Sequence, residues 1–222
     1  MPSLTTAAPA QAPLSQPNAE ERFEAIVDSG LLGVGVPSHM GGHGGDLKDL
    51  FVDETAIRWL QGLQDPDLQI FQSQRLVIEA LVRSENIALR EFHLPELLTG
   101  NLAGASTLAC SPLDAKTHGL GWKFHGQLED VPNLQWLGFS LLLPVQTAGE
   151  VKGVLLVRSE ESGVSVRSGQ TPSLWVQAAC GDVHFNQVFL RADEWLGDPP
   201  LWAELLQVHQ SLRAGVHNTT HR

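Results

Sequence analysis

The sequence has little of the cysteine and the basic charge that several classes of protein require. Its two cysteines, Cys110 and Cys180, allow at most one bridge, and no CxxC motif is present. A disulfide framework is therefore excluded, and a reducing compartment fits. Lys and Arg total 14 against 25 Asp and Glu, which gives a formal net charge of −11. A surface this acidic repels phosphate backbones, and no local Lys/Arg cluster in the sequence offsets it, so nucleic acid is not an expected partner.

Long apolar runs and targeting signals are also missing. The longest apolar run, around Trp136 to Val145, is about ten residues long, whereas a membrane helix needs roughly 20. The chain has no Lys or Arg before Arg22 and no apolar signal core, so neither a secretory nor a mitochondrial signal is expected. We therefore expect a cytoplasmic protein with no membrane partner.

Motifs for metal, nucleotide and nucleophilic chemistry are absent as well. His39 and His43 are four residues apart, but Gly41 and Gly42 lie between them, so they cannot share a helical face as a zinc-binding HExxH pair does. The run Gly33-Val34-Gly35 follows an expected helix instead of a strand, which argues against a dinucleotide-binding fold. No Walker loop and no GxSxG motif is present. These patterns predict no metal ligand and no nucleophile.

The sequence does contain an ordered series of expected helices. Residues 1–17 are rich in Ala, Pro, Ser and Thr, and we expect a disordered leader there. Asn18, with Glu21 in the capping-box position, predicts the start of a helix that ends at Gly30. Three more helices follow the Gly-rich stretch 31–45: one from Asp46 through Leu60, one from about Pro66 through Ile78, and one near Ile87 to Leu98, where Pro95 is expected to kink or break it.

From Ser106 to Leu190 the sequence consists of short apolar or alternating runs separated by Gly, Pro, Asn and Asp. Such runs predict the strands of an antiparallel barrel or sandwich. The expected strands are Ser106–Cys110, Trp122–Leu128, Trp136–Leu143, Gly153–Val157, Val164–Val166, Trp175–Ala179 and Val183–Val188. The predicted fold class is therefore α+β, with helices first and an antiparallel β-domain second.

A last helix is expected from Pro199 to about Arg213. Its apolar stripe consists of Leu201, Trp202, Leu205, Leu206 and Leu212. A single amphipathic helix is not stable alone, so the stripe either docks back on the body or meets another chain. The predicted organisation is a leader at 1–17, a helical domain at 18–102, a β-domain at 103–197, and a helix with a polar tail at 198–222.

Several segments resemble motifs of the acyl-CoA dehydrogenase family and follow the family order from about residue 20 to 197. They are Ser29–Pro37 followed by Gly41, Gly42 and Gly44, then His93–Gly100, Ala109–Pro112, Gly121–Gly126 and Gly181–Leu190. The related flavin-dependent monooxygenases match nearly as well. The resemblance implies an oxidoreductase that acts on CH–CH groups and uses FAD, with FMN as the alternative cofactor.

By this resemblance the flavin would lie against two strand ends, Ala109-Cys110-Ser111 and Val131-Pro132-Asn133. Both depart from the family pattern. Cys110 stands where the family has a hydroxyl, and a thiol is a weak hydrogen-bond donor. Pro132 offers no backbone N–H, and Asp130 places a carboxylate where the family has an aromatic wall. A carboxylate there is unfavourable beside a flavin that gains negative charge on reduction.

The resemblance also implies a C-terminal helical domain, of which this sequence is expected to hold only the first helix. No residue of the sequence matches the catalytic glutamate of the family. Three hypotheses remain open: a truncated flavoprotein that is not catalytic alone, a non-catalytic interaction subunit that docks on a full-length relative, and a degenerate remnant without cofactor. The expected partner is a full-length homologous subunit, or a second copy through the last helix, so we expect an oligomer.

Overall fold

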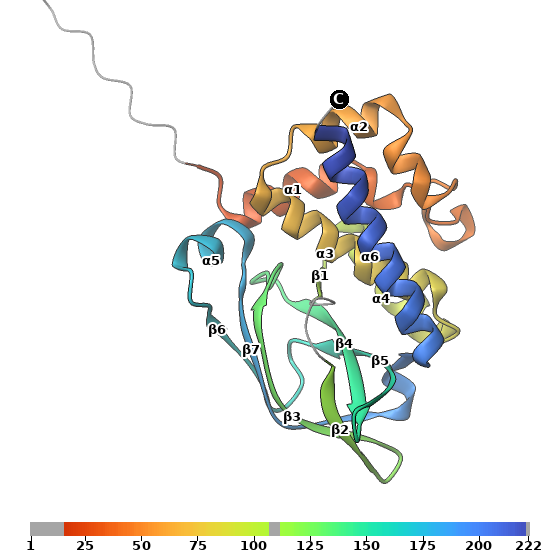
Figure 1. The fold of residues 1–222 in the computed structure, drawn as a ribbon, viewed down its shortest axis with the longest axis vertical. Helices are drawn as coiled ribbons and strands as arrows, with labels where there is room; N and C mark the ends of the chain where they lie inside the picture. Colours follow the sequence, from red (N-terminus) through yellow and green to blue (C-terminus); the bar gives the residue numbers. More distant parts are fainter. Residues whose placement is uncertain (1–15, 107–111, 221–222) are drawn as a thin grey trace, which may run out of the picture.

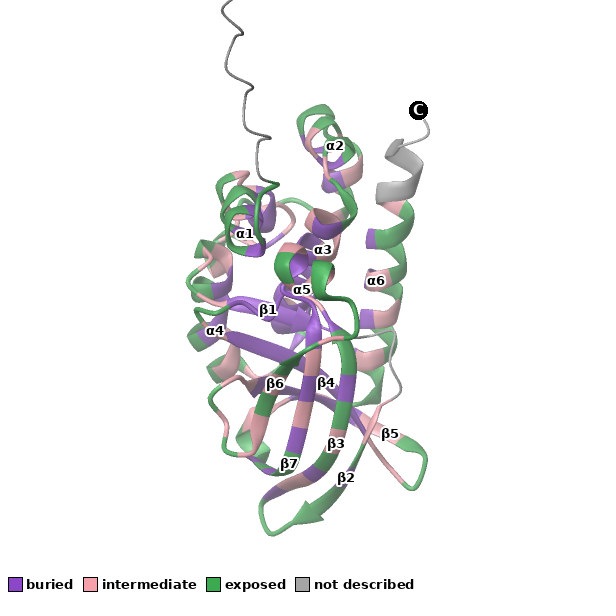
Figure 2. Ribbon diagram, turned by 90° about the vertical axis from the view of Figure 1, so that its left-hand side faces the viewer, coloured by how far each residue is buried: buried purple, intermediate pink, exposed green. Residues whose placement is uncertain are grey.

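The computed structural model describes residues 16–106 and 112–220, with side chains described to residue 215. These residues form six α-helices and eight strands, with one helix closing the chain, which confirms the predicted α+β class. Figure 1 shows most of the helices at one end of the molecule and the strands at the other. Burial is concentrated where the two parts meet, around α3 (Asp65–Arg83) and β1 (Ala103–Ser106), as Figure 2 shows.

Helix α1 (Ala19–Asp28) begins as its sequence predicts. The side chain of Asn18 accepts a hydrogen bond from the backbone N–H of Glu21, and the Glu21 carboxylate accepts one from the backbone N–H of Asn18. This capping box satisfies two N–H groups that have no partner within the helix. The helix ends before Gly30, whose φ of 72° lies in the left-handed region that glycine favours.

The Gly-rich stretch forms two 3₁₀ turns, η1 (Leu31–Gly33) and η2 (Ser38–Met40), and a buried arginine of α3 holds the first of them. One Nη of Arg75 donates to the carbonyl of Leu32, and the other lies 2.6 Å from the Glu79 carboxylate. Glu79 also pairs with Arg83 at 2.8 Å. Burial lowers the pKa of Arg75, although the charge of Glu79 opposes that shift. Because removing one partner would leave a buried charge unpaired, this ion network fixes η1 to the helix.

The single helix expected after Asp46 is in fact two elements. They are the 3₁₀ turn η3 (Leu47–Phe51) and helix α2 (Glu54–Gln61). The chain breaks between them because the carboxylate of Asp53 accepts hydrogen bonds from the N–H groups of Thr55 and Ala56, both at 2.9 Å. An aspartate in this position starts a new helix.

Helix α4 (Ile87–Thr99) corrects the expectation of a break at Pro95, because the helix continues through that residue. The proline removes one backbone donor from the helix interior. Leu94 and Leu97, on either side of it, are both buried in the common hydrophobic core. Core packing therefore outweighs the local cost. The helix ends at Gly100 with a φ of 76°. Strand β1 follows, close to Ser106, where the short apolar runs of the sequence begin.

The sheet is mostly antiparallel, with the strand order β6-β7-β3-β2-β4-β5-β8, and β1 pairs with β4 in parallel. The remaining strands are β2 (Leu113–His118), β3 (Gly121–Val131), β4 (Phe139–Thr147), β5 (Glu150–Arg158), β6 (Val164–Ser168), β7 (Gly181–Arg191) and β8 (Trp195–Gly197). Strands β4 and β5 carry almost continuous buried runs, because helices cover them.

The strand predictions were wrong at two segments and missed two strands. Of the segment Trp175–Ala179, all but the last residue belong to helix α5 (Pro172–Ala178), which starts at a proline that suits the first turn of a helix. Trp136 lies in a loop, and β4 begins only at Phe139. Strands β2 and β8 were not predicted, because β2 alternates weakly and β8 has three residues. Of the expected strand Ser106–Cys110, residues 107–110 lie outside the described part.

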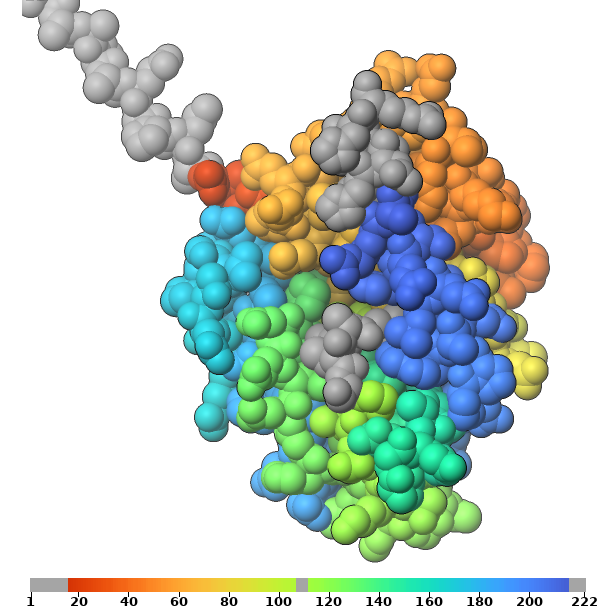
Figure 3. Space-filling view, in the orientation of Figure 1, coloured from red at the N-terminus to blue at the C-terminus, as the bar shows by residue number. Residues whose placement is uncertain are grey.

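Helix α6 (Pro199–Thr220) docks back on the body, which is one of the two alternatives open for it. It contacts α3, α2 and β5, and Figure 3 shows it lying across the helical part. Leu201, Leu205 and Leu212 are buried, and each buried leucine contributes about 1.5–3 kcal/mol. Trp202 and Leu206 of the predicted stripe are half-buried. Among the described residues, no helix is long and apolar enough to cross a membrane.

Candidate functional site

The residues predicted to contact flavin belong to two strand ends, and the structure describes one of them. Ala109, Cys110 and Ser111 lie outside the described residues. Val131 is the last residue of β3, and Pro132 and Asn133 follow it, where the chain passes close to α3 and α5. Val131 and Asn133 are buried and Pro132 is half-buried. The predicted contact of these residues with flavin stays a prediction.

Asn133 is bonded on all sides by the protein itself. Its side-chain amide donates to the Oε1 of Gln74 and to the carbonyl of Gly104, both at 3.0 Å, and its Oδ1 accepts from the Nε2 of Gln135 at 3.0 Å. Its backbone N–H donates to the carbonyl of Ala178 at 3.0 Å. Every donor of this residue is therefore used within the fold.

Gln74 of α3 is the centre of this buried polar network. Its Nε2 donates to the carbonyls of Leu97 and Leu102 at 2.8 and 3.2 Å, and its Oε1 accepts from Gly104 and Asn133. The network thus joins α3, the end of α4, β1 and the loop after β3. A buried network of this kind stabilises one arrangement when all its members are satisfied.

The described strand end fits a flavin poorly. Pro132 has no N–H, the N–H groups of Asn133 are already bonded, and the N–H of Asp130 donates to the carboxylate of Asp182 at 3.1 Å. Two carboxylates thus lie beside the end of β3. The pKa of the nearby Cys180 thiol is raised to about 11, mainly by burial and then by the negative charges of Asp130 and Asp182. The same charge would oppose the reduction of a flavin placed here.

An exposed apolar surface lies on the other side of the same loop. Trp136 is 99% exposed and Val176 is 58% exposed, and Leu137 beside Trp136 is also exposed. Trp136 and Val176 border a hollow of about 500 Å³. The hollow is lined mainly by Leu134, Phe139, Val166, Trp175 and Ala179, with Asn18, Glu20, Gln135 and Ser159 on its polar side. We call Trp136, Leu137, Val176 and this hollow the Trp136 surface.

The loop that carries Trp136 is held in place. Gln135 is buried, and its Nε2 donates to the carbonyl of Ala19 in α1 at 3.2 Å. The N–H of Leu134 donates to the carbonyl of Ala179 at 2.9 Å, and the N–H of Gly138 donates back to Gln135 at 3.1 Å. The loop is therefore anchored before Trp136, at Leu134 and Gln135, and closed after it by the bond from Gly138 to Gln135. The exposure of Trp136 is a feature of the fold and does not come from a loose loop.

An acidic stripe borders the Trp136 surface. Glu20, Glu24 and Asp28 are exposed and follow one another at four-residue spacing, so they share one side of α1. They line a second hollow of about 320 Å³ together with Val27 and Leu137. An exposed apolar group beside a charged rim is the usual composition of a protein-binding surface.

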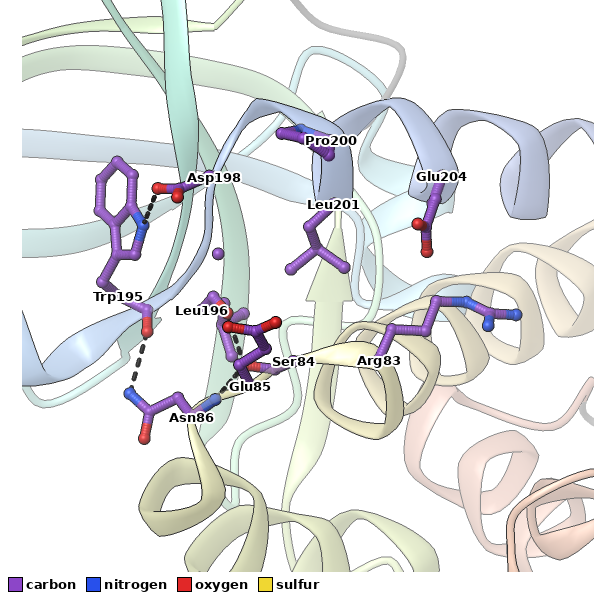
Figure 4. Close-up of a pocket in the computed structure, with 11 residues that line it drawn as sticks. Arg83, Ser84, Glu85, Asn86, Trp195, Leu196, Asp198, Pro200, Leu201 and Glu204 are labelled. Atoms are coloured by element: carbon purple, nitrogen blue, oxygen red, sulfur yellow. Dashed lines mark hydrogen bonds between the residues drawn. The ribbon is translucent and has the colours of Figure 1, made fainter.

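The polar hollow in Figure 4 is a structural junction. It lies between the turn from α3 to α4 and the start of α6. Ser84 donates to the carbonyl of Leu196, Asn86 donates to the carbonyl of Trp195 at 2.9 Å, and the indole N–H of Trp195 donates to Asp198 at 3.2 Å. Because its polar groups bind one another, this hollow ties the helical part to the last strand. Among the described residues no group of three or more His, Cys, Asp and Glu could hold a metal ion.

Sequence reasoning missed the Gln74 network and the Trp136 surface. Gln74 bonds to residues 23 to 59 positions away, so no local pattern marks it. Trp136-Leu137-Gly138 did carry a signal, because a glycine directly after two large apolar residues suits a turn more than a strand. Gly138 indeed has a φ of 112°.

Comparison with known proteins shows similarity in structure only. No protein-family model matches the sequence, and no curated protein sequence matches it. The ChsE4-ChsE5 complex from Mycobacterium tuberculosis is similar with a TM-score of 0.71 and 21% identity, over 92% of this chain and 55% of that chain. A glutaryl-CoA dehydrogenase from Mycobacterium smegmatis in complex with FADH2 is similar with a TM-score of 0.71 and 17% identity, over 87% of this chain and 53% of that chain.

A third similar structure is the Tcur3481-Tcur3483 steroid ACAD G363A variant, with a TM-score of 0.65 and 21% identity. The alignment covers 87% of this chain and 52% of that chain. This chain thus spans about half the length of these solved chains, and identities this low establish the fold alone. Over most of its length, the chain has the fold of the acyl-CoA dehydrogenase family.

Proposed function

We propose that this chain is a subunit of an acyl-CoA dehydrogenase-type flavoprotein assembly, in which a partner of the same fold holds the flavin and carries out the oxidation. The observation that carries the proposal is the fully exposed indole of Trp136 at the rim of an apolar hollow, on a loop anchored at Leu134, Gln135 and Gly138. Tryptophan is among the residues that contribute most to binding at protein interfaces, and exposed apolar patches mark interaction sites.

Pairing of two chains with this fold has a precedent among the similar structures. The ChsE4-ChsE5 structure is described as a complex, and the Tcur3481-Tcur3483 structure also names two chains. A homologous partner subunit is therefore the kind of protein that we expect on the Trp136 surface. The acidic stripe of Glu20, Glu24 and Asp28 favours a partner with Lys or Arg at the matching rim.

FAD is the flavin that we expect in the assembly, with FMN as the alternative, since one similar structure contains FADH2. A flavin supplies the acceptance of a hydride. In this chain the donors of Asn133 are occupied, and Asp130 and Asp182 place negative charge beside them. We therefore assign the main contacts of the cofactor to the partner, and this chain positions the partner without touching the reacting atoms.

The visible absorbance spectrum of the purified chain, recorded alone and after addition of FAD or FMN, tests where the flavin is held. We expect no flavin band to remain with this chain after gel filtration. A band that survives would contradict the proposal. It would favour the stand-alone flavoprotein in which Ala109-Cys110-Ser111 and Val131-Pro132-Asn133 contact the ring.

A binding experiment tests the surface itself. The partner is first identified by co-purification with the tagged chain, and the complex is then rebuilt from the two purified proteins. We expect Trp136→Ala to weaken binding by about 2–4 kcal/mol, roughly 30- to 1,000-fold in Kd. Leu120→Ala is the matched control, because Leu120 is 89% exposed and lies at the distant tip of the β2–β3 hairpin. Equal effects of the two changes would refute the assignment of the Trp136 surface.

A further inference from the structure

The fold creates a basic cluster that the sequence does not show. Strands β2 and β3 form a hairpin in which Lys116 lies directly opposite Lys123. Two like charges at opposite positions of an antiparallel pair destabilise it, because their Cβ atoms lie about 4.5–5.5 Å apart. In a chain with a net charge of −11, carboxylates are plentiful, so an unpaired lysine pair needs an explanation.

The other two lysines of the chain behave as expected for an acidic protein. Lys152 lies 2.7 Å from the carboxylate of Glu150, and Lys48 lies 3.9 Å from that of Asp46. Within the described residues, neither Lys116 nor Lys123 has a carboxylate within 4.0 Å. The hairpin therefore presents two ammonium groups together, neither of them in an ion pair with a carboxylate of the described residues.

The two lysines line an open hollow of about 460 Å³, and the other groups around it are mostly hydrogen-bond donors. His118 and His125 come from the same hairpin, and Gln187 comes from β7. Asp114 is the carboxylate at this hollow, and its Oδ1 accepts from the Nε2 of Gln146 at 3.2 Å. Figure 1 shows the hairpin at the end of the molecule that lies opposite α2. This hollow shares no lining residue with the hollow beside Trp136.

A β-bulge shapes one wall of the hollow. Phe124 pairs with Val188 and Gly126 pairs with Phe185, so two residues of β7, Asn186 and Gln187, face one residue of β3. Gln187 has a φ of 55°, which is uncommon for a residue other than glycine. Bulges of this kind redirect a side chain and occur often beside functional sites. Here the bulge brings the amide of Gln187 to the lysines.

An aromatic contact holds the other wall. The ring of His118 meets that of Phe189 edge to face, with centroids 6.0 Å apart. Such a contact restricts the imidazole to one orientation beside the lysines. The hollow thus combines two flexible cations with an oriented imidazole and an amide.

We propose that this hollow binds the phosphate group of a small phosphorylated molecule. A phosphate presents three or more acceptor oxygens and up to two negative charges, which match two ammonium groups and the N–H donors around them. A single carboxylate carries one negative charge and would leave one of the two lysine charges uncompensated. A nucleic acid backbone is disfavoured as the source of the phosphate, because it would extend past this hollow onto the surface of a chain with a net charge of −11. The site is independent of the proposed docking of a partner on the Trp136 surface.

Isothermal titration at fixed ionic strength, maintained with NaCl, tests the proposal with inorganic pyrophosphate and with O-phosphoserine. The two probes separate a diphosphate from a phosphomonoester. We expect saturable binding of at least one probe with one site per chain. The double change Lys116→Gln and Lys123→Gln should weaken it at least tenfold. The matched control is Lys48→Gln with Lys152→Gln, which removes the same charge from the two ion-paired lysines and should leave the affinity unchanged.

A second readout does not depend on the affinity. Without added anion, Lys116→Gln should raise the midpoint of thermal unfolding, because it removes the repulsion from Lys123; with saturating pyrophosphate the order of the two proteins should reverse. Absence of saturable binding by either probe at fixed ionic strength would overturn the proposal. So would equal losses in the two double variants, which would mean that the anions respond only to net charge.

Discussion

Replacement of Asn133 by alanine would measure how much the buried network contributes to the fold. The side chain of Asn133 makes three hydrogen bonds, to Gln74, Gly104 and Gln135, each at 3.0 Å. A hydrogen bond of this kind contributes about 1 kcal/mol net, so three contribute about 3 kcal/mol. Asn133 also has a φ of 65°, where alanine costs roughly 1 kcal/mol. We expect the free energy of unfolding to fall by about 4 kcal/mol, a large part of the roughly 5–15 kcal/mol that holds a domain together.

Asn133→Gly is the matched control for that change. It removes the same three hydrogen bonds but tolerates the left-handed backbone, so we expect a loss of about 3 kcal/mol, roughly 1 kcal/mol less than for alanine. Urea unfolding followed by circular dichroism gives both values, provided that the slope of the free energy against urea is the same in all three proteins.

The outcome distinguishes a structural role for Asn133 from a role in cofactor binding. A loss below about 1 kcal/mol in both variants would refute the reasoning, because the network would then contribute little. If the variants were as stable as the parent and instead released a bound flavin, the contact predicted from the family resemblance would be correct. Both results are read from the same purified proteins.

Three further predictions concern stability. Ala148→Gly should raise the free energy of unfolding by about 1 kcal/mol in urea titrations, because Ala148 has a φ of 53° in the two-residue turn between β4 and β5; a loss of stability would contradict this. Leu205→Ala should lower the free energy of unfolding by about 2–5 kcal/mol, because Leu205 is a fully buried residue of α6; a loss below 1 kcal/mol would mean that α6 is not docked. Burial lowers the pKa of His93 and of His209 in the folded protein. As the pH falls below about 6.5, these histidines therefore take up protons first in the unfolded chain, and the midpoint of thermal unfolding should drop. His93→Gln should flatten that drop, and an unchanged profile would exclude His93 as its source.

Local chemistry explains which parts of the fold could be predicted from the sequence. The start of α1 depends on Asn18 and Glu21, three residues apart, and the prediction was correct because all its determinants lie within one turn. The segment Trp175–Ala179 was predicted as a strand and is helical. Its short apolar run fits either structure, and the proline at the start of the helix decides between them. For Pro95 the sequence predicted a kink or a break of the helix, and a break is wrong. The leucines around Pro95 are buried in a core that the sequence does not reveal.

The candidate sites were less predictable because they depend on long-range pairing. The register of the β2–β3 hairpin brings Lys116 to Lys123, and neither residue is notable alone. Gln74, the partner of Asn133 on α3, is 59 residues away in the sequence. The resemblance of Val131-Pro132-Asn133 to a cofactor contact therefore did not indicate the network. Trp136 was assigned to a strand, and its exposure follows only from the loop that Gln135 and Gly138 fix.

The docking of α6 has a consequence for how the protein is made. Ser84 bonds to Leu196 across 112 positions, and Leu201, Leu205 and Leu212 complete the core around α3. During synthesis the chain emerges from its N-terminus, so the apolar side of α3 stays open to water until α6 has left the ribosome. Contacts of such long range also slow folding. A nascent chain therefore exposes an uncovered core until α6 emerges, and chaperones that bind apolar segments should associate with it up to that point.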